Sequence, residues 1–448
     1  MGPVRAVDRD ILRLALPALG ALAAEPIFLL ADTAMVGHLG KDALASLALA
    51  GVVVQTVLGL MIFLAYATTP RVARFVGAGD LKRAVSAGFD GMWLALVVSV
   101  VLVAAGLPLL GPVLRMFDPS PEVFAGALSY VTVSWWGLPF MLIVIAATGL
   151  LRGMQDTVTP LIVAAGGFGL NIGLNAVFIY GMGLGVAGSA WGSVLAHAAM
   201  CSVYLVFAGR AARRHNASLA PDWSGVLSAA STSGWLLIRS ASLRAALIVL
   251  VSVASVMGTV SLAAVQIAQT LFNSLALVLD SLAIAGQAMI GLYVGKDDTQ
   301  KVHTVKTRLI VWGVGFGIVV GVVLAVVSPF VGRVFTSSPE VVSTVAVLVL
   351  ILALSMPLAG YVFTLDGILL GASDARYLAL AQFGAAAGFA LLVWAAMGMS
   401  FTISALWACF CFGFMAFRAV GLGARMRGEG WIRRARAVAL LDAKQKEH

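Results

Sequence analysis

The sequence predicts an all-α integral membrane protein, in which twelve transmembrane helices form two parallel six-helix repeats. Three observations predict this fold. The 448 residues are 61% hydrophobic and only 11% charged, whereas soluble domains are about 45–50% apolar and about 25% charged. The chain contains twelve apolar runs long enough to cross ~30 Å of hydrocarbon. Finally, one register of internal similarity relates the two halves of the chain.

The apolar runs are separated by turn-forming or charged segments, such as the one that ends at Gly79 and Asp80. Each run is close to or above the ~20 residues that a membrane-spanning helix needs. The predicted spans are 11–37, 43–70, 84–107, 123–148, 158–180, 186–208, 226–256, 261–294, 304–330, 341–369, 376–398 and 401–424.

The distribution of basic residues predicts the orientation of the chain. Lys and Arg concentrate in the N-terminal segment, in every second loop and in the C-terminal tail, whereas the other loops carry only Lys41, Arg115 and Arg333. By the positive-inside rule, both termini are cytoplasmic. The net charge of +9 therefore indicates membrane topology and not nucleic-acid binding. We expect a multi-pass protein of the inner or plasma membrane that works as a monomer.

Over a long stretch, the two halves align without gaps when the sequence is shifted by 218 residues. Gly40 then falls on Gly258, and Asp80 falls on Asp298. An even number of spans in each half makes the repeats parallel, an arrangement found in secondary transporters. The predicted domains are an N-terminal lobe (1–208), a cytoplasmic linker (209–225), a C-terminal lobe (226–424) and a basic cytoplasmic tail (425–448).

Four carboxylates lie at membrane depth, where a charged group costs ~3 kcal/mol or more unless it faces a polar cavity. Asp32 and Glu25 share nearly the same face of the first helix, and Pro26 between them is expected to bend or loosen that helix. Asp280 and Asp366 are the other two acids. Asp32 is the predicted ion-coupling residue, and the remaining acids are secondary candidates.

Two arginines, Arg239 and Arg244, lie inside the seventh span. Either arginine could pair with Asp280 or Asp366, which would make that acid structural. The sequence leaves the pairing open.

Three further polar residues are candidates to line the same cavity as Asp32. Asn171 and Asn175 are one helical turn apart, and Ser193 lies in the next span. A lone Asn in a membrane helix usually joins helices through a hydrogen bond, but this pair occurs in a chain with a buried acid.

The sequence contains no recognisable catalytic motif of the HExxH or GxSxG type and no phosphate-binding loop. The three cysteines lie in apolar runs without metal-ligand spacing. We therefore expect no enzyme activity, no metal and no cofactor, and a transport process driven by an ion gradient. An intramembrane enzyme is the disfavoured alternative.

At several of these residues the chain resembles the multidrug and toxic compound extrusion (MATE) family, and within it the DNA-damage-inducible F (DinF) subfamily. The similar segments occur in both halves. They are ADTAMVGHLG from Ala31, LLRGMQDTVTP from Leu150, NIGLNAVFIYGMGLGVAGSAWGS from Asn171, LDSLAIAGQAMIGLYVG from Leu279 and LDGILLGASD from Leu365.

The resemblance implies two lobes around a V-shaped cavity and multidrug efflux by antiport against a cation. Asp32 matches the coupling acid of the family, and Asn171, Asn175 and Ser193 match the rest of its polar site. Some members carry a second carboxylate where this chain has Asn175. Arg239 lies in the region where the sodium-coupled branch has a glutamate.

The resemblance therefore favours protons over sodium as the coupling ion. A cavity charged by the ionised Asp32 would favour small cationic or amphipathic organic molecules as substrates. Sodium coupling and a lipid-linked precursor flippase of the same superfamily are the alternatives.

Overall fold

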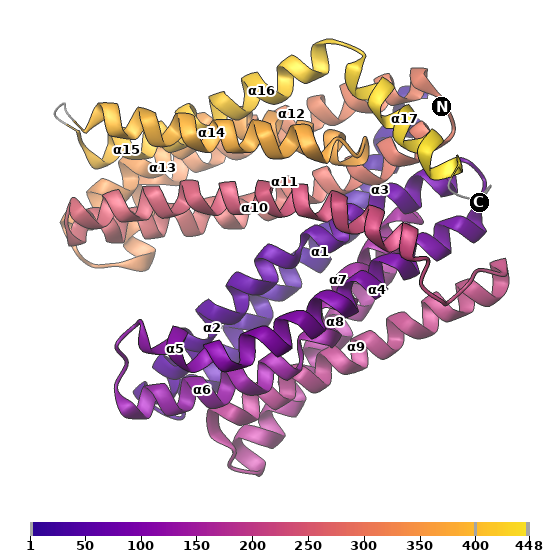
Figure 1. The fold of residues 1–448 in the computed structure, drawn as a ribbon. Helices are drawn as coiled ribbons and strands as arrows, with labels where there is room; N and C mark the ends of the chain where they lie inside the picture. Colours follow the sequence, from indigo (N-terminus) through magenta and orange to yellow (C-terminus); the bar gives the residue numbers. More distant parts are fainter. Residues whose placement is uncertain (1–2, 398–400, 445–448) are drawn as a thin grey trace. The chain divides into compact units, whose positions relative to one another are not determined.

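The protein is described by a computed structural model that covers residues 3–397 and 401–444 (Figure 1). Positions at the edges of the predicted N-terminal lobe, of the span 376–398 and of the tail lie outside these residues. The described residues form helices joined by short connections. The helices are α1 (Pro3–Gly37), α2 (Lys41–Met61), α3 (Phe63–Gly77), α4 (Leu81–Gly106), the 3-10 helix η1 (Leu107–Leu109), α5 (Leu110–Arg115), α6 (Pro121–Trp136), α7 (Leu138–Gly153), α8 (Val158–Asn175), the π-helix η2 (Ala176–Gly181), α9 (Gly185–His215), α10 (Trp223–Val256), α11 (Thr259–Gly295), α12 (Thr299–Phe335), α13 (Pro339–Gly371), α14 (Ala375–Ala396), α15 (Ile403–Ala408), the π-helix η3 (Cys409–Phe414), α16 (Met415–Arg427) and α17 (Gly430–Lys444).

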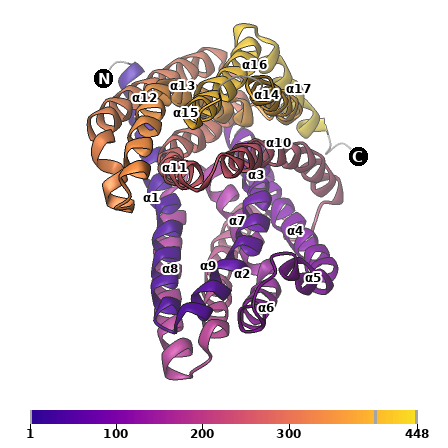
Figure 2. The ribbon, with the colours of Figure 1, turned by 90° about the vertical axis from the view of Figure 1, so that its left-hand side faces the viewer.

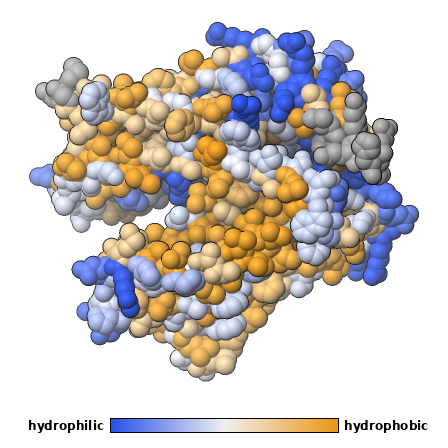
Figure 3. Space-filling view, viewed as in Figure 1, coloured by the Kyte–Doolittle hydropathy of each residue, from blue (hydrophilic) through white to orange (hydrophobic). Residues whose placement is uncertain are grey.

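The all-α membrane fold is confirmed. Among the described residues, eleven helical segments are long and apolar enough to cross a membrane, and the pair α6 and α7, bent by 51°, can form a twelfth span. Figure 3 shows apolar residues along the helices and hydrophilic residues gathered around α17. This separation is expected of helices whose middle sections face hydrocarbon.

The chain divides into two compact units. The N-terminal unit is Leu16–Ser233, and the C-terminal unit is Met1–Ala15 together with Gly234–His448. The division therefore falls inside α1 and inside α10. The start of α1 belongs to the C-terminal unit, and the start of α10 belongs to the N-terminal unit. Ala15 and Ser233, the last residues before the two divisions, are related by the shift of 218 residues.

The segment 209–225, predicted as a linker, is helical at both ends. α9 continues to His215, where Asn216 adopts a left-handed conformation with φ of 51°, and α10 begins at Trp223. Only Asn216–Asp222 is non-helical. The predicted tail is also largely helical, since α17 spans Gly430–Lys444. This helix packs against α11 and α16 and buries Trp431 completely.

Repeat-related positions adopt the same local conformations, which supports the internal duplication. Gly40 and Gly258 have φ angles of 117° and 106° at the start of the second helix of each half. Gln155 and Ser373, which are related by the same shift, both have positive φ values of 66° and 56°. A further equivalent pair caps helix N-termini. Asp80 accepts a hydrogen bond from the backbone N–H of Arg83, and Asp298 accepts one from the backbone N–H of Lys301, both at 2.9 Å.

Positions 90 and 308, which are also related by the shift of 218 residues, contact the chain at or near the starts of α10 and α1. In the C-terminal unit, Arg308 forms a bidentate ion pair with Asp8 of α1 at 2.7 and 2.8 Å. In the N-terminal unit, the equivalent position is Asp90, which accepts from the backbone N–H of Asp222 at 3.2 Å, next to the start of α10. The chemistry has diverged between the repeats, but the docking position has been kept.

The core of the C-terminal unit depends on the close approach of α12 and α13, which lie side by side in both ribbon views (Figures 1 and 2). A stripe of glycines on α12 allows it. A Cβ atom at Gly317 would lie 2.4 Å from the backbone oxygen of Met356, and one at Gly321 would lie 2.5 Å from that of Ala353. Small residues let membrane helices approach closely and gain van der Waals contact.

We expect Gly317→Leu to destabilise the C-terminal unit by about 1–3 kcal/mol or more, because the new side chain meets backbone atoms that cannot move independently. The measurement is the thermal unfolding temperature of the detergent-solubilised protein. Gly315→Leu is the matched control on the same helix, since no atom lies within 4 Å of a Cβ there. Equal stability of the two variants would contradict the packing described for α12 and α13.

Candidate functional site

Asp32 lies inside the N-terminal unit, where only 2% of its surface is exposed. Its Oδ1 atom accepts two hydrogen bonds, one from Asn175 Nδ2 at 2.9 Å and one from Ser189 Oγ at 2.5 Å. Helices α1, α8 and α9 supply these three residues. A buried carboxylate is costly unless its oxygens are hydrogen-bonded, and these two donors partly meet that need.

The hydrogen bonds continue away from Asp32 along α8 and α9. Asn175 Nδ2 also donates to Asn171 Oδ1 at 3.0 Å, and Asn171 Nδ2 donates to Ser193 Oγ at 3.0 Å. Residues four apart share a helix face, which explains why Asn171 and Asn175 are aligned and why Ser189 and Ser193 are aligned. The structure thus brings together Asp32 and all three polar residues predicted with it.

A glycine on α9 provides the space for this network. A Cβ atom at Gly192 would lie only 1.9 Å from Asn175 Oδ1. Helices α8 and α9, which run side by side (Figure 2), can therefore press the Asn175 amide against the backbone of α9. Asn175 Oδ1 itself is buried and has no hydrogen-bond partner among the described residues.

The backbone changes its helical form directly after Asn175. The α-helical α8 ends at that residue and continues as the π-helix Ala176–Gly181. Short π-helical segments are frequent at functional sites and loosen the regular hydrogen-bond ladder. The amide of Asn175 is therefore attached to a helix end that is less tightly constrained than a helix interior.

Two residues of this cluster are missing from the sequence prediction. Ser189 donates directly to Asp32, and the buried phenol of Tyr130 lies near Asp32 and the hydroxyls of Ser189 and Ser193. Ser189 could have been found from its position one turn before Ser193. Tyr130 carries no such signal, because a tyrosine in an apolar helix is common.

Asp32 has no ion-pair partner among the described residues, which distinguishes it from the other buried acids. Asp90 lies 3.4 Å from the guanidinium of Arg71, and Asp374 lies 2.7 Å from that of Arg425. The groups that hold Asp32 are neutral amide and hydroxyl donors. Such a carboxylate can gain and lose a proton without breaking an ion pair.

Glu25 and Pro26 do not join the Asp32 cluster. Both residues are exposed, and Glu25 has no hydrogen bond or ion pair among the described residues. Pro26 lies within α1, which continues as one helix from Pro3 to Gly37, so this proline does not interrupt the helix. Glu25 lies on the exposed side of α1, whereas Asp32 turns into the unit.

The C-terminal unit contains a different buried acid cluster. Arg239 of α10 forms an ion pair with Asp366 of α13, and Arg418 Nη2 of α16 lies 3.6 Å from the same carboxylate. All three side chains are at least nine-tenths buried. Asp280 is partly buried and interacts electrostatically with Arg418. The open question of the Arg239 partner is therefore answered by Asp366, whereas Arg244 is exposed.

This second cluster brings opposite charges together, since two guanidinium groups face Asp366 and the carboxylate of Asp280 interacts with Arg418. Arg418 is further enclosed by the rings of Phe363 and Phe414, with centroids 5.4 and 5.7 Å from its Cζ atom. Breaking a buried ion pair by removing one partner costs about 3–5 kcal/mol. The cluster therefore has the properties of a structural centre of the C-terminal unit.

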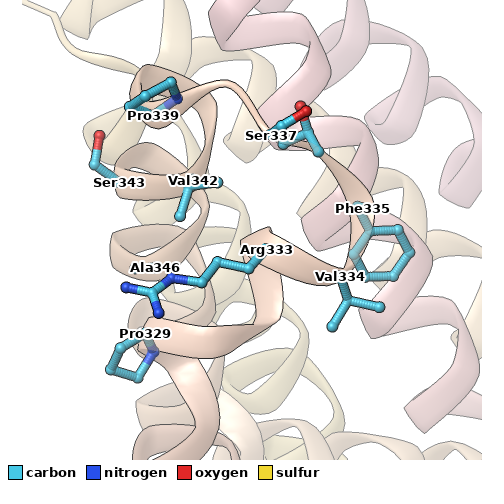
Figure 4. Close-up of a pocket in the computed structure, with 10 residues that line it drawn as sticks. Pro329, Arg333, Val334, Phe335, Ser337, Pro339, Val342, Ser343 and Ala346 are labelled. Carbon is cyan, nitrogen blue, oxygen red and sulfur yellow. The ribbon is translucent and has the colours of Figure 1, made fainter.

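A pocket of about 910 Å³ lies elsewhere in the C-terminal unit, where α12 ends and α13 begins (Figure 4). Arg333 lines it together with Pro329, Phe335 and Ser337. The guanidinium of Arg333 already lies over the ring of Phe330, at 5.8 Å. None of the residues predicted as a functional site lines this pocket.

Comparisons with known proteins agree with the fold. The model of the MatE family matches residues 17–177 and 238–395, one segment in each half. Protein DETOXIFICATION 45, chloroplastic, of Arabidopsis thaliana is 29% identical over 89% of this chain and 76% of its own length. A probable multidrug resistance protein NorM of Thermotoga maritima is 24% identical over 82% of this chain and 81% of its own length.

Solved structures show the same fold at low sequence identity. A MATE protein crystallised in the bent conformation has a TM-score of 0.87 at 20% identity and covers 98% of this chain and 99% of its own. The transporter VcmN of Vibrio cholerae has a TM-score of 0.86 at 17% identity, with 98% and 99% of the two chains covered.

We expect Arg239→Gln to destabilise the protein by about 3–5 kcal/mol, because Asp366 loses a buried charged partner. Thermal unfolding in detergent measures the effect. Arg244→Gln is the control, since this exposed arginine on the same helix should change stability by no more than about 0.5 kcal/mol. A small effect of Arg239→Gln would show that the buried pair is not a structural centre.

Proposed function

Because the chain belongs to the MatE family of multidrug and toxic compound extrusion transporters, we propose that it exports small organic solutes in exchange for protons, with Asp32 as the coupling acid. The observation that carries this proposal is the environment of Asp32, which is buried but held only by neutral donors. The other fully buried acids of the described residues, Asp90, Asp366 and Asp374, each have an arginine partner.

The hydrogen bonds around Asp32 suggest how protonation is sensed. The ionised carboxylate accepts from Asn175 and Ser189, whereas a protonated carboxyl becomes a donor and needs an acceptor. Asn175 Oδ1 is a buried acceptor without a partner among the described residues. Rotation of the Asn175 amide would present this oxygen to the protonated acid.

This rotation would have consequences beyond Asp32. Asn175 Nδ2 also donates to Asn171, which in turn donates to Ser193. Turning the amide withdraws the first of these bonds, so the facing surfaces of α8 and α9 must adjust. Proton binding at one carboxylate would thus change helix packing in the N-terminal unit, which is what a transport cycle requires.

Protons are favoured over sodium by the identity of the atoms that face Asp32. An alkali cation needs several oxygen ligands, whereas Asn175 presents its Nδ2 atom and Ser189 its hydroxyl hydrogen to the carboxylate. Each proton that enters contributes about 2.3 kcal/mol of driving force per 100 mV of membrane potential, and the pH gradient contributes further driving force.

The substrate class and setting belong to the same proposal. Relatives named as multidrug resistance proteins NorM and MdtK support small organic substrates, and an ionised Asp32 favours cationic or amphipathic ones. The basic loops support a plasma or inner membrane protein with both termini in the cytoplasm. We further propose that the transporter acts as a monomer and belongs to the DinF subfamily.

We expect proteoliposomes to export a fluorescent cationic dye when a pH gradient alone is applied, and we expect Asp32→Asn to abolish this efflux. Asparagine keeps the shape of the side chain but cannot exchange a proton. Asp42→Asn is the control, because Asp42 is an exposed acid in the same unit. Efflux driven only by a sodium gradient, or full efflux by a folded Asp32→Asn variant, would contradict the proposal.

Gly192→Ala tests the position of Asn175 without changing any polar group. The new methyl group would displace Asn175 Oδ1 and weaken buried hydrogen bonds worth about 1–3 kcal/mol. We expect pH-driven efflux to fall roughly 5- to 150-fold. Gly173→Ala on α8 is the control, since nothing lies within 4 Å of a Cβ there. A similar loss of efflux in both variants would show that the position of Asn175 does not control transport.

A further inference from the structure

A second pocket, of about 420 Å³, lies within the C-terminal unit between α12, α13 and α16. Its polar lining consists of Lys306, Tyr361 and Arg427, and none of the described residues that line it is acidic. Its apolar lining includes Ile310, Leu365 and Val420. The pocket therefore combines two positive charges, a phenol and a hydrocarbon wall.

The polar groups of this pocket have no partner within the described protein. Neither Lys306 nor Arg427 forms an ion pair, and the Tyr361 hydroxyl forms no hydrogen bond, among the described residues. Neighbouring basic residues behave differently. Arg308 pairs with Asp8, and Arg425 pairs with Asp374.

The pocket lies close to the helix ends. Lys306 is seven residues after the start of α12, and Tyr361 is ten residues before the end of α13. With a rise of 1.5 Å per residue, these side chains lie about 10–15 Å from those ends. This depth corresponds to the boundary between headgroups and hydrocarbon in a bilayer.

The apolar wall is open to the outside of the unit. Val420 is 72% exposed, and it lies one turn before Gly423 and Ala424, which line the pocket near the end of α16. In a membrane protein, an exposed valine at this depth contacts acyl chains. The cations are therefore placed beside a surface that already faces lipid.

We propose that this pocket binds an anionic phospholipid. Lys306, Arg427 and the Tyr361 hydroxyl would contact its phosphate, and the apolar wall that includes Ile310 and Val420 would contact an acyl chain. Ammonium and guanidinium groups form strong charge-assisted hydrogen bonds with phosphate. Basic pockets between membrane helices bind anionic headgroups in this way. The site is independent of Asp32, which lies in the N-terminal unit.

The test is native mass spectrometry of the full chain in detergent, titrated with phosphatidylglycerol. We expect one bound lipid and at least tenfold weaker binding for the Lys306→Gln/Arg427→Gln double variant. Arg433→Gln/Arg434→Gln is the matched control, because it removes two exposed charges of α17 outside the pocket. Equal loss in both double variants, or no loss in the first, would overturn the proposal.

A third variant changes the space and leaves every charge in place. Gly423 lines the pocket, and a Cβ there would lie 3.1 Å from the Tyr361 hydroxyl. We expect Gly423→Leu to reduce phosphatidylglycerol binding at least tenfold, with unfolding temperatures measured to confirm that the variant is folded. Unchanged lipid binding by this folded variant would place the lipid elsewhere.

Two further measurements distinguish a lipid headgroup from free phosphate as the bound group. We expect phosphatidylcholine, whose headgroup has no net charge, to bind at least tenfold more weakly than phosphatidylglycerol. Millimolar inorganic phosphate should leave the bound lipid in place, because it lacks the acyl chains. Displacement by inorganic phosphate, or equal binding of both lipids, would overturn the assignment to an anionic phospholipid.

Discussion

The N-terminal unit is organised by the need to keep one carboxylate, Asp32, buried without a counter-charge. An isolated buried carboxylate is strongly unfavourable, so α1 must meet donors from other helices at this depth. Asn175 and Ser189 supply those donors. Their positions depend on the spacing of four residues on α8 and α9 and on Gly192, which allows the Asn175 amide to lie against the backbone.

The two units solve the problem of buried acids in opposite ways. Asp366 of the C-terminal unit forms an ion pair with Arg239 and is approached by Arg418, so its charge faces two buried guanidinium groups. Asp32 is held by neutral donors, so a change of its charge breaks no ion pair among the described residues. Duplication thus produced two similar helical frameworks, of which one carries a buried acid held by neutral donors and the other an ion-pair centre.

The sequence predicted the helices, the repeat and most of the Asp32 cluster, because these features depend on composition and local spacing. Asn171 and Asn175 share a helix face in any α-helix, and the shift from Gly40 to Gly258 is visible in the letters. The contact of Arg239 with Asp366 could not be predicted, since it joins residues 127 positions apart. The division of the chain inside α1 and α10 was also hidden, because it depends on which unit each helix start packs against.

If Asp32 exchanges protons for cationic solutes, as we propose, binding of such a solute should favour its ionised form and release a proton. The most direct measurement is the pH change of a weakly buffered detergent solution of the protein after a cationic substrate is added. We expect the wild-type protein to release protons and Asp32→Asn, with unchanged folding, to release none. Proton release of equal size from both proteins would contradict it.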